Sequence, residues 1–230
     1  MRALDVASKA GYDPVDPCGF RATYSWPVDI HTTLHKDRDR CINQILKTAH
    51  ERNIKVITFP CGIMNWGFDE IIQHDPAVLT DNRYNMKPLR EESWQWTFKI
   101  FDFVMDNYDF DGFHLESADQ GRCKTQECME KWPSNVAYHC YVTGQMADHI
   151  RKKYRNKIVV ATIQSFASYG RVFAKEERAR LVELSKHIDC LFDQGHAGTS
   201  IPPKDWAEFI PELHFAYGTS GGIWIYTKQR

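Results

Sequence analysis

The sequence predicts an α/β fold, a (β/α)8 barrel of the TIM type that is incomplete, with six to seven βα units visible. Short runs of β-branched and aromatic residues alternate with longer segments of helical spacing, which is typical of βα units repeated around a parallel sheet. The length of 230 residues and the hydrophobic content of 43% suit one domain of this size. No G-x-G-x-x-G turn follows a strand, so the sequence lacks the usual nucleotide site of the alternative, an open doubly wound sheet.

Seven runs are the candidate strands, and most of them are as short as barrel strands usually are. In chain order they are Phe20–Tyr24, Lys55–Phe59, Asp111–Leu115, Ile158–Thr162, Cys190–Phe192, Leu213–Ala216 and Ile223–Tyr226. Polar residues follow most of these runs closely, which matters because reactive groups of a parallel barrel lie at the carboxyl ends of its strands.

Segments of helical spacing fill the intervals between these runs. Residues 36–51 and 93–107 each place their apolar side chains on one face, which can cover a sheet. Further helices are predicted over 136–154, 175–186 and 204–209. These segments are the crossover helices of the βα repeat.

A complete barrel of eight units needs about 250 residues. The chain begins inside a helix-like segment and stops soon after a strand-like run. We therefore predict that residues 1–230 are a single domain and a fragment of a longer chain, with one unit missing at an end.

The composition argues against several classes of partner. The net charge is −1, from 29 basic and 30 acidic residues, so no positive field would hold nucleic acid or an anionic membrane. No stretch reaches the roughly 20 apolar residues that cross a bilayer, and the first residues lack the apolar core of a signal peptide. The sequence predicts a soluble chain. It leaves the compartment open, since a longer parent chain can be secreted or periplasmic, and it leaves the oligomeric state open.

The most informative segment contains the predicted strand Asp111–Leu115. Alternation along this strand sends His114 and Glu116 to the same face, into the mouth of the barrel. A carboxyl group among the aromatic walls expected there has its charged form desolvated, which raises its pKa toward the value that a general acid needs. Glu116 is therefore the predicted acid; the alternative is a surface carboxylate that caps the next helix, beside a core histidine. Asp109 and Asp111 precede the strand and are predicted to make turn hydrogen bonds at its other end.

Polar and aromatic residues at the strand ends complete the predicted pocket. The candidates for contact with a carbohydrate are Trp26, Trp66, His114, Arg122, Gln164, His196, Tyr217 and Trp224. Indole faces suit sugar rings, and the polar side chains can hydrogen-bond to hydroxyl groups. Packing or loop anchoring is the alternative for each of them.

Two stretches resemble the barrel domains of hexosaminidase-like and α-glucuronidase-like glycoside hydrolases, which include polysaccharide-utilisation proteins. Arg52–Ile72 is similar to the strand after which a Trp-Gly-Phe element lines the sugar pocket, and Phe110–Cys123 resembles the strand that carries the acid. The resemblance implies a hydrolase of O-glycosidic bonds in a poly- or oligosaccharide. It also implies that Glu116 is the general acid and Trp66 a sugar platform. No cofactor is predicted.

The second catalytic carboxylate is left open by the sequence. Retaining barrels of the commonest kind place a second Glu near the end of a late strand, and Leu213–Ser220 offers none. Asp193 can act as a base toward water in an inverting scheme, which requires carboxyl groups about 6.5–9.5 Å apart. Asp119 or Asp193 can instead orient an acetamido group of the substrate in a substrate-assisted scheme.

Cys123 and Cys128 form a C-x4-C pair that can hold zinc or form a disulfide. His139 is a nearby candidate for a further metal ligand, and plain buried thiols are the alternative.

Two function classes compete with the hydrolase. In the first, His114, Glu116 and His196 bind a divalent ion in a metal-dependent isomerase or lyase, although no compact metal motif supports it. In the second, the barrel binds carbohydrate without catalysis.

Overall fold

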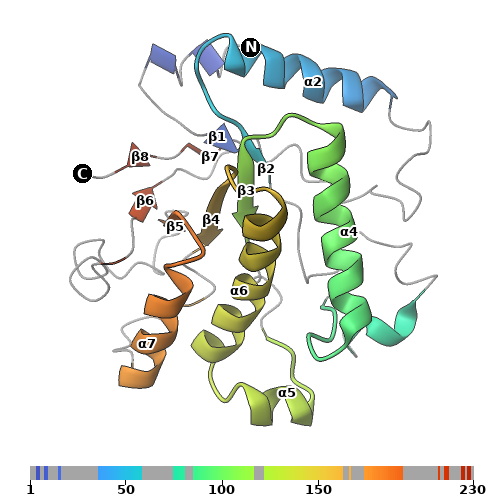
Figure 1. Ribbon diagram of the computed structural model, residues 1–230, viewed down its shortest axis with the longest axis vertical. Coiled ribbons are helices and arrows are strands. Elements are labelled where there is room, and N and C mark those ends of the chain that lie inside the picture. The colour runs from blue at the N-terminus through green and yellow to red at the C-terminus, as the bar shows by residue number, and fades with distance from the viewer. Residues whose placement is uncertain are drawn as a thin grey trace.

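The computed structural model of the chain is drawn in Figure 1. It describes residues 4–5, 8–9, 15–16, 36–58, 75–80, 85–116, 122–162, 166, 174–193, 212, 215–217, 224–225 and 227–228. Of these, residues 15–16, 36–38, 193, 215–217, 224–225 and 227–228 are described by their backbone alone.

A six-stranded sheet runs through the molecule in the order β2-β3-β4-β5-β6-β8. Its strands are β2 (Ile57–Thr58), β3 (Gly112–Leu115), β4 (Ile158–Thr162), β5 (Cys190–Asp193), β6 (Phe215–Tyr217) and β8 (Thr227–Lys228). The four pairings that join β2 to β6 are parallel, whereas β8 pairs antiparallel with β6. The predicted α/β fold with a parallel sheet is confirmed over β2 to β6, while closure into a barrel stays a prediction.

Four long helices occupy intervals that helical spacing predicted. They are α2 (Lys36–His50), α4 (Glu91–Asn107), α6 (Asn135–Lys153) and α7 (Lys175–Leu184). Two short helices, η3 (Pro76–Val78) and α5 (Gln126–Lys131), were not predicted. Figure 1 shows α4, α6 and α7 side by side in front of the strands, with α2 across the upper end. The predicted strand 20–24 and helix 204–209 lie outside the described residues.

Local sequence explains where α6 begins and ends. Ser134 precedes the helix, and its hydroxyl oxygen accepts a hydrogen bond from the backbone N–H of Ala137 at 3.1 Å. This N-cap satisfies one of the amide groups that the first turn leaves without a helical partner. Three basic residues, Arg151 to Lys153, occupy the last turn, where positive charge is favourable to the helix dipole.

The two faces of the sheet have different neighbours. Phe113, Leu115 and Val159 belong to the large apolar core that includes the side chains of α4 and α6. Ile57, Val160 and Phe192 form a separate small cluster on the opposite face. We call this opposite face the inner face, and His114 lies on it because it alternates with Phe113 and Leu115.

The end of the chain differs from the prediction. Ile223–Tyr226 was predicted as a further strand of the parallel repeat, but β7 (Trp224–Ile225) pairs antiparallel with β1 (Val15–Asp16) in a separate two-stranded sheet. The reason is the short connection, because only residues 218–223 separate β6 from β7. A parallel return needs a crossover of about a dozen residues or more.

Aspartates at the amino ends of two strands tie neighbouring strands together. The carboxylate of Asp111 accepts a hydrogen bond from the backbone N–H of Val56 at 2.8 Å, and that of Asp189 accepts one from Val159 at 2.7 Å. Each carboxylate also pairs with a basic side chain, from α2 for Asp111 and from α6 for Asp189. Asp111 lies at the predicted end of β3, away from Glu116, but its carboxylate bonds a neighbouring strand and α2 where turn hydrogen bonds were predicted.

None of the helices in the described part of the chain combines the length and the apolar character needed to cross a bilayer.

Candidate functional site

The carboxyl ends of β3, β4 and β5 carry the described part of the predicted site. Side chains are described for His114, Glu116, Arg122, Cys123 and Cys128. Only the backbone is described for Asp193, Tyr217 and Trp224. The remaining predicted residues, Trp26, Trp66, Asp119, Gln164 and His196, lie outside the described residues.

His114 is a fully buried polar side chain on the inner face of the sheet, with 0% of its surface exposed. Its Nε2 atom lies 2.6 Å from Oγ1 of Thr162 on β4. Its ring meets that of Phe192 on β5 edge to face, with centroids 5.4 Å apart and planes at 87°. Thr162 and Phe192 are themselves partners in the β4–β5 register. The imidazole is therefore fixed against two neighbouring strands, and its burial agrees equally with the alternative interpretation as a hydrogen-bonded core histidine.

Glu116 follows β3 directly and lies two residues beyond His114, which puts it on the same face by strand alternation. Because Leu115 is the partner of Ala161, Glu116 lies level with Thr162 at the carboxyl edge of the sheet. Its exposed fraction is only 3%. The alternative of a surface carboxylate is therefore wrong. A carboxyl group enclosed by protein at a strand end is what the predicted acid requires.

The ends of β5 and β6 bring two more predicted residues to this edge. Asp193 and Tyr217 are partners in the β5–β6 register, and Asp193 comes directly after Phe192. The backbone of Asp193 thus lies at the same edge of the sheet as Glu116, two strands away. Trp224 does not join this group, because β7 belongs to the separate sheet with β1.

Arg122 and His139 lie in the segments that follow β3. A guanidinium nitrogen of Arg122 donates a hydrogen bond to the backbone oxygen of Trp132 at 2.7 Å. His139, on α6, is 2% exposed, and its ring meets that of Phe166 edge to face with centroids 6.4 Å apart. Burial, aided by the charge of Arg122, lowers the pKa of His139 to about 3. The imidazole is therefore neutral at physiological pH.

Cys123 and Cys128 are buried free thiols on either side of the start of α5. Oγ1 of Thr125 lies 3.4 Å from Sγ of Cys123 and also accepts a hydrogen bond from the backbone N–H of Cys128 at 3.4 Å. Burial and a hydrogen bond with the Cys123 thiol raise the pKa of Cys128 to about 12. In the described residues, no three His, Cys, Asp or Glu side chains form a group suited to hold a metal ion.

The sequence did not point to Thr162 as part of this site. Thr162 ends a run that was predicted as a strand, and alternation from Val160 was a visible signal of which face it occupies. Placing it against His114, however, requires knowing that β3 and β4 are neighbours in register, with His114 opposite Val160. That information arises from the tertiary fold.

No protein-family model matches the sequence, and no curated protein matches it. Solved structures match the fold. The chitobiase of Flavobacterium johnsoniae aligns with a TM-score of 0.58 at 15% identity, over 96% of this chain and 41% of the chitobiase. The β-N-acetylhexosaminidase of Bacteroides fragilis aligns with a TM-score of 0.59 at 12% identity, over 94% of this chain and 46% of that enzyme. The α-amylase of Geobacillus thermoleovorans aligns with a TM-score of 0.50 at 14% identity, over 82% of this chain and 43% of the amylase.

The chain is thus similar in structure to TIM-barrel glycoside hydrolase domains, including those of hexosaminidases and amylases. The predicted hexosaminidase-like resemblance is confirmed at the level of the fold, and its α-glucuronidase-like part stays a prediction. The chain spans less than half the length of each of these three enzymes. At identities of 12–15% the likeness concerns the fold alone.

Proposed function

We propose that this chain is the barrel part of a glycoside hydrolase that cleaves O-glycosidic bonds of an oligo- or polysaccharide, with Glu116 as the general acid. The observation that carries this proposal is the burial of Glu116, 3% exposed, directly after β3. Active sites of barrel enzymes lie at the carboxyl ends of the strands. The fold shared with hexosaminidases and an amylase supports the class of reaction.

In the proposed reaction the carboxyl group of Glu116 gives its proton to the glycosidic oxygen while the bond from that oxygen to the anomeric carbon breaks. An alkoxide leaves poorly without this proton. The acid therefore lowers the barrier most for natural glycosides, whose leaving group is the hydroxyl oxygen of another sugar. His114 lies on the same face and has no exposed surface. We therefore assign it a positioning role beneath the acid, in place of the direct sugar contact that the sequence suggested.

The second carboxylate of the reaction is Asp193 or Asp119 in this proposal. The backbone of Asp193 lies at the same sheet edge as Glu116. As a base it would activate a water molecule in an inverting scheme; as an orienting group it would hold the substrate's own acetamido group. Tyr217, the register partner of Asp193 at the end of β6, is a proposed sugar contact, and Trp26, Trp66, Arg122, Gln164 and His196 are proposed with it.

The similar enzymes suggest which sugars to test first. A chitobiase and a β-N-acetylhexosaminidase are among them, and so is an α-amylase. Aryl N-acetyl-β-hexosaminides are accordingly the first candidates, followed by aryl α-glucosides and aryl glucuronides. We expect the purified chain, or its parent protein, to hydrolyse one member of this panel.

The test compares the wild type with Glu116→Gln on the sugar that is hydrolysed. Loss of the acid is expected to lower kcat by about 10²–10⁴-fold, since this is what a general acid usually contributes. The substitution keeps the size of the side chain, so binding of the sugar should persist. Glu183→Gln, an exposed position on α7, is the matched control and should leave kcat unchanged.

Two outcomes would contradict the proposal. Sugar binding without hydrolysis in the wild type would favour a barrel that binds carbohydrate only. Activity that a chelator abolishes, and that Glu116→Gln leaves intact, would favour the metal-dependent isomerase or lyase.

A further inference from the structure

The start of α5 brings two buried cysteines to the same side chain. Cys123 and Cys128 have exposed fractions of 1% and 2%. Both residues contact Thr125, because its Oγ1 lies 3.4 Å from Sγ of Cys123 and 3.4 Å from the backbone nitrogen of Cys128. The neighbouring Cys123 thiol also helps to raise the pKa of Cys128. A disulfide would hold the two sulfur atoms about 2.05 Å apart.

The backbone around the pair is held from both sides, which keeps the two thiols together. The ring of Tyr138, on α6, meets that of Trp132 edge to face, with centroids 5.7 Å apart. The Arg122 side chain donates a hydrogen bond at 2.7 Å to the carbonyl of Trp132, the residue that ends α5. We call residues 122–132 the clasp. Its ends are joined by Arg122, and both cysteines lie within it.

We propose that the clasp is a redox site, in which Cys123 and Cys128 are the reduced form of a reversible intramolecular disulfide. The co-reactant is a low-molecular-weight disulfide such as oxidised glutathione. One cysteine, as its thiolate, attacks a sulfur of that disulfide and expels a thiolate. The second cysteine then attacks the resulting mixed disulfide at the cysteine sulfur and expels a second thiolate. Two protein thiols are oxidised by two electrons, one disulfide is reduced to two thiols, and the protons pass to the leaving thiolates.

The other described cysteines have different surroundings. Cys41 is exposed on α2, Cys140 lies on α6, and Cys190 lies on β5 against the small cluster of the inner face. Cys128 has a thiol as its neighbour. None of these three cysteines is expected to compete for Cys128 in the folded chain.

Burial affects the rate of oxidation more than its outcome. The raised pKa of Cys128 leaves little thiolate at neutral pH, so exchange in the folded protein is expected to be slow and to accelerate with pH. The disulfide would link the segment that leads away from Glu116 to α5 and would restrain the clasp. This inference does not depend on the proposed hydrolase activity.

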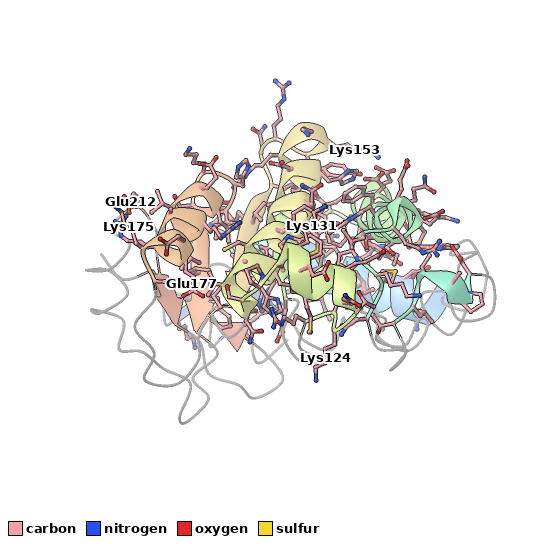
Figure 2. The ribbon with its side chains drawn as sticks, turned by 90° about the horizontal axis from the view of Figure 1, so that it is seen from below. Lys124, Lys131, Lys153, Lys175, Glu177 and Glu212 are labelled. Atoms are coloured by element: carbon pink, nitrogen blue, oxygen red, sulfur yellow. The ribbon has the colours of Figure 1, made fainter. Side chains whose placement is uncertain are left out.

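The sequence allows a direct assay. Trypsin cuts after Arg122, Lys124 and Lys131, so Cys123 falls on the dipeptide Cys123–Lys124 and Cys128 on the heptapeptide Thr125–Lys131. Figure 2 shows the side chain of Lys124 extending away from the helices, between the two cysteines in sequence. A disulfide therefore joins two peptides that otherwise separate, and the joined species has a mass of its own.

The experiment incubates the reduced full chain with oxidised glutathione at pH 8.5 until its thiol content no longer changes. Remaining thiols are alkylated in denaturant, and the masses of the tryptic peptides are measured by mass spectrometry. We expect the joined peptide as the main form of both cysteines, and its loss on addition of dithiothreitol. We also expect the oxidised chain to melt at a higher temperature than the reduced chain, because the cross-link restricts the unfolded state.

Variants make the result specific. Cys128→Ser should abolish the joined peptide and leave Cys123 free or bound to glutathione, whereas Cys140→Ser should leave the joined peptide unchanged. Recovery of Cys123 and Cys128 from the wild type as separate alkylated or glutathione-bound peptides would overturn the proposal. A disulfide from either of them to another cysteine would overturn it equally.

Discussion

At the scale of single residues, the hydrogen bond between His114 and Thr162 is the best-defined contact of the candidate site. Both side chains have 0% exposure, and the two atoms are 2.6 Å apart. Thr162→Val keeps the shape of the side chain and removes the hydroxyl. We expect it to lower the free energy of unfolding by about 1–3 kcal/mol, the usual cost of depriving a buried polar group of a partner. Urea unfolding of the two proteins measures this difference.

Thr162→Ser is the complementary substitution, because it keeps the hydroxyl group and removes the methyl group. It retains the oxygen, so the ¹⁵N chemical shifts of the His114 ring should stay close to those of the wild type, whereas Thr162→Val should change them. Equal ring shifts in all three proteins would show that Thr162 does not set the tautomer of His114.

Titration of His139 is expected to make the free energy of unfolding depend on pH. Burial, with the charge of Arg122, lowers its folded-state pKa to about 3, while an unfolded chain has a histidine pKa of about 6.5. Below pH 6.5, His139 therefore binds a proton in the unfolded state but stays neutral in the folded state until the pH approaches 3. The contribution of His139 is complete above pH 6.5 and is lost as the pH falls toward 3, by up to about 1.4 kcal/mol per pH unit.

Urea unfolding between pH 7 and pH 4 measures this loss. Glutamine at this position cannot titrate. In His139→Gln the free energy of unfolding should therefore fall less steeply with decreasing pH, by a slope that corresponds to the uptake of up to about one proton on unfolding. Identical slopes for the two proteins would mean that the folded state accommodates a charged His139.

Residue by residue, the sequence located Glu116 and His114 on one face because strand alternation is a local property. It could not reveal Thr162 as a partner, because that contact depends on which strands are neighbours. The burial of Glu116 was likewise an expectation from the barrel, and the 3% exposure now supports it.

At the scale of elements, the close approach of β3 and β4 accounts for a glycine at position 112. A Cβ atom there would clash with the carbonyl oxygen of Ile158. Gly112→Ala must therefore push the two strands apart. We expect a loss of about 1–3 kcal/mol in the free energy of unfolding, as for other overpacked sites.

Gly144 is the matched control for this substitution. It lies inside α6, and a Cβ atom there would meet nothing within 4 Å. Gly144→Ala should raise the free energy of unfolding by about 0.5–1 kcal/mol, because alanine loses less backbone freedom in a helix. A Gly112→Ala protein as stable as the wild type would show that β3 and β4 can separate without cost.

The sequence predicted the long helices and the strands β2 to β6 well, but it missed the two short helices and the pairing of β7. Ile158–Thr162 was predicted with the bounds that β4 has, since a run of β-branched residues has a strong local preference. The six residues of α5 carry no amphipathic repeat, and Thr125 caps them through a hydroxyl whose role appears only in the fold. The pairing of β7 with β1 joins opposite ends of the chain, which no local pattern can indicate.

At the scale of the whole molecule, short strands from both ends of the chain lie beside the two outer strands of the parallel sheet. β8 pairs with β6, and β7, one residue earlier in the chain, pairs with β1. β1 in turn lies beside β2, the strand at the other end of the six-stranded sheet (Figure 1). Segments from the two ends of the chain are thus brought together by β1 and β7, while closure of the sheet into a barrel stays a prediction.

The account as a whole depends on Glu116 acting as the acid, and the most direct measurement is the dependence of kcat on the leaving group. Aryl glycosides of one sugar with leaving groups from dinitrophenol to phenol would be compared in the wild type and in Glu116→Gln. An acid is needed most where the leaving group is poor. We predict a shallow dependence in the wild type and a steep one in the variant, with little loss for the dinitrophenyl glycoside. A loss by the same factor for every leaving group would show that Glu116 does not protonate the glycosidic oxygen.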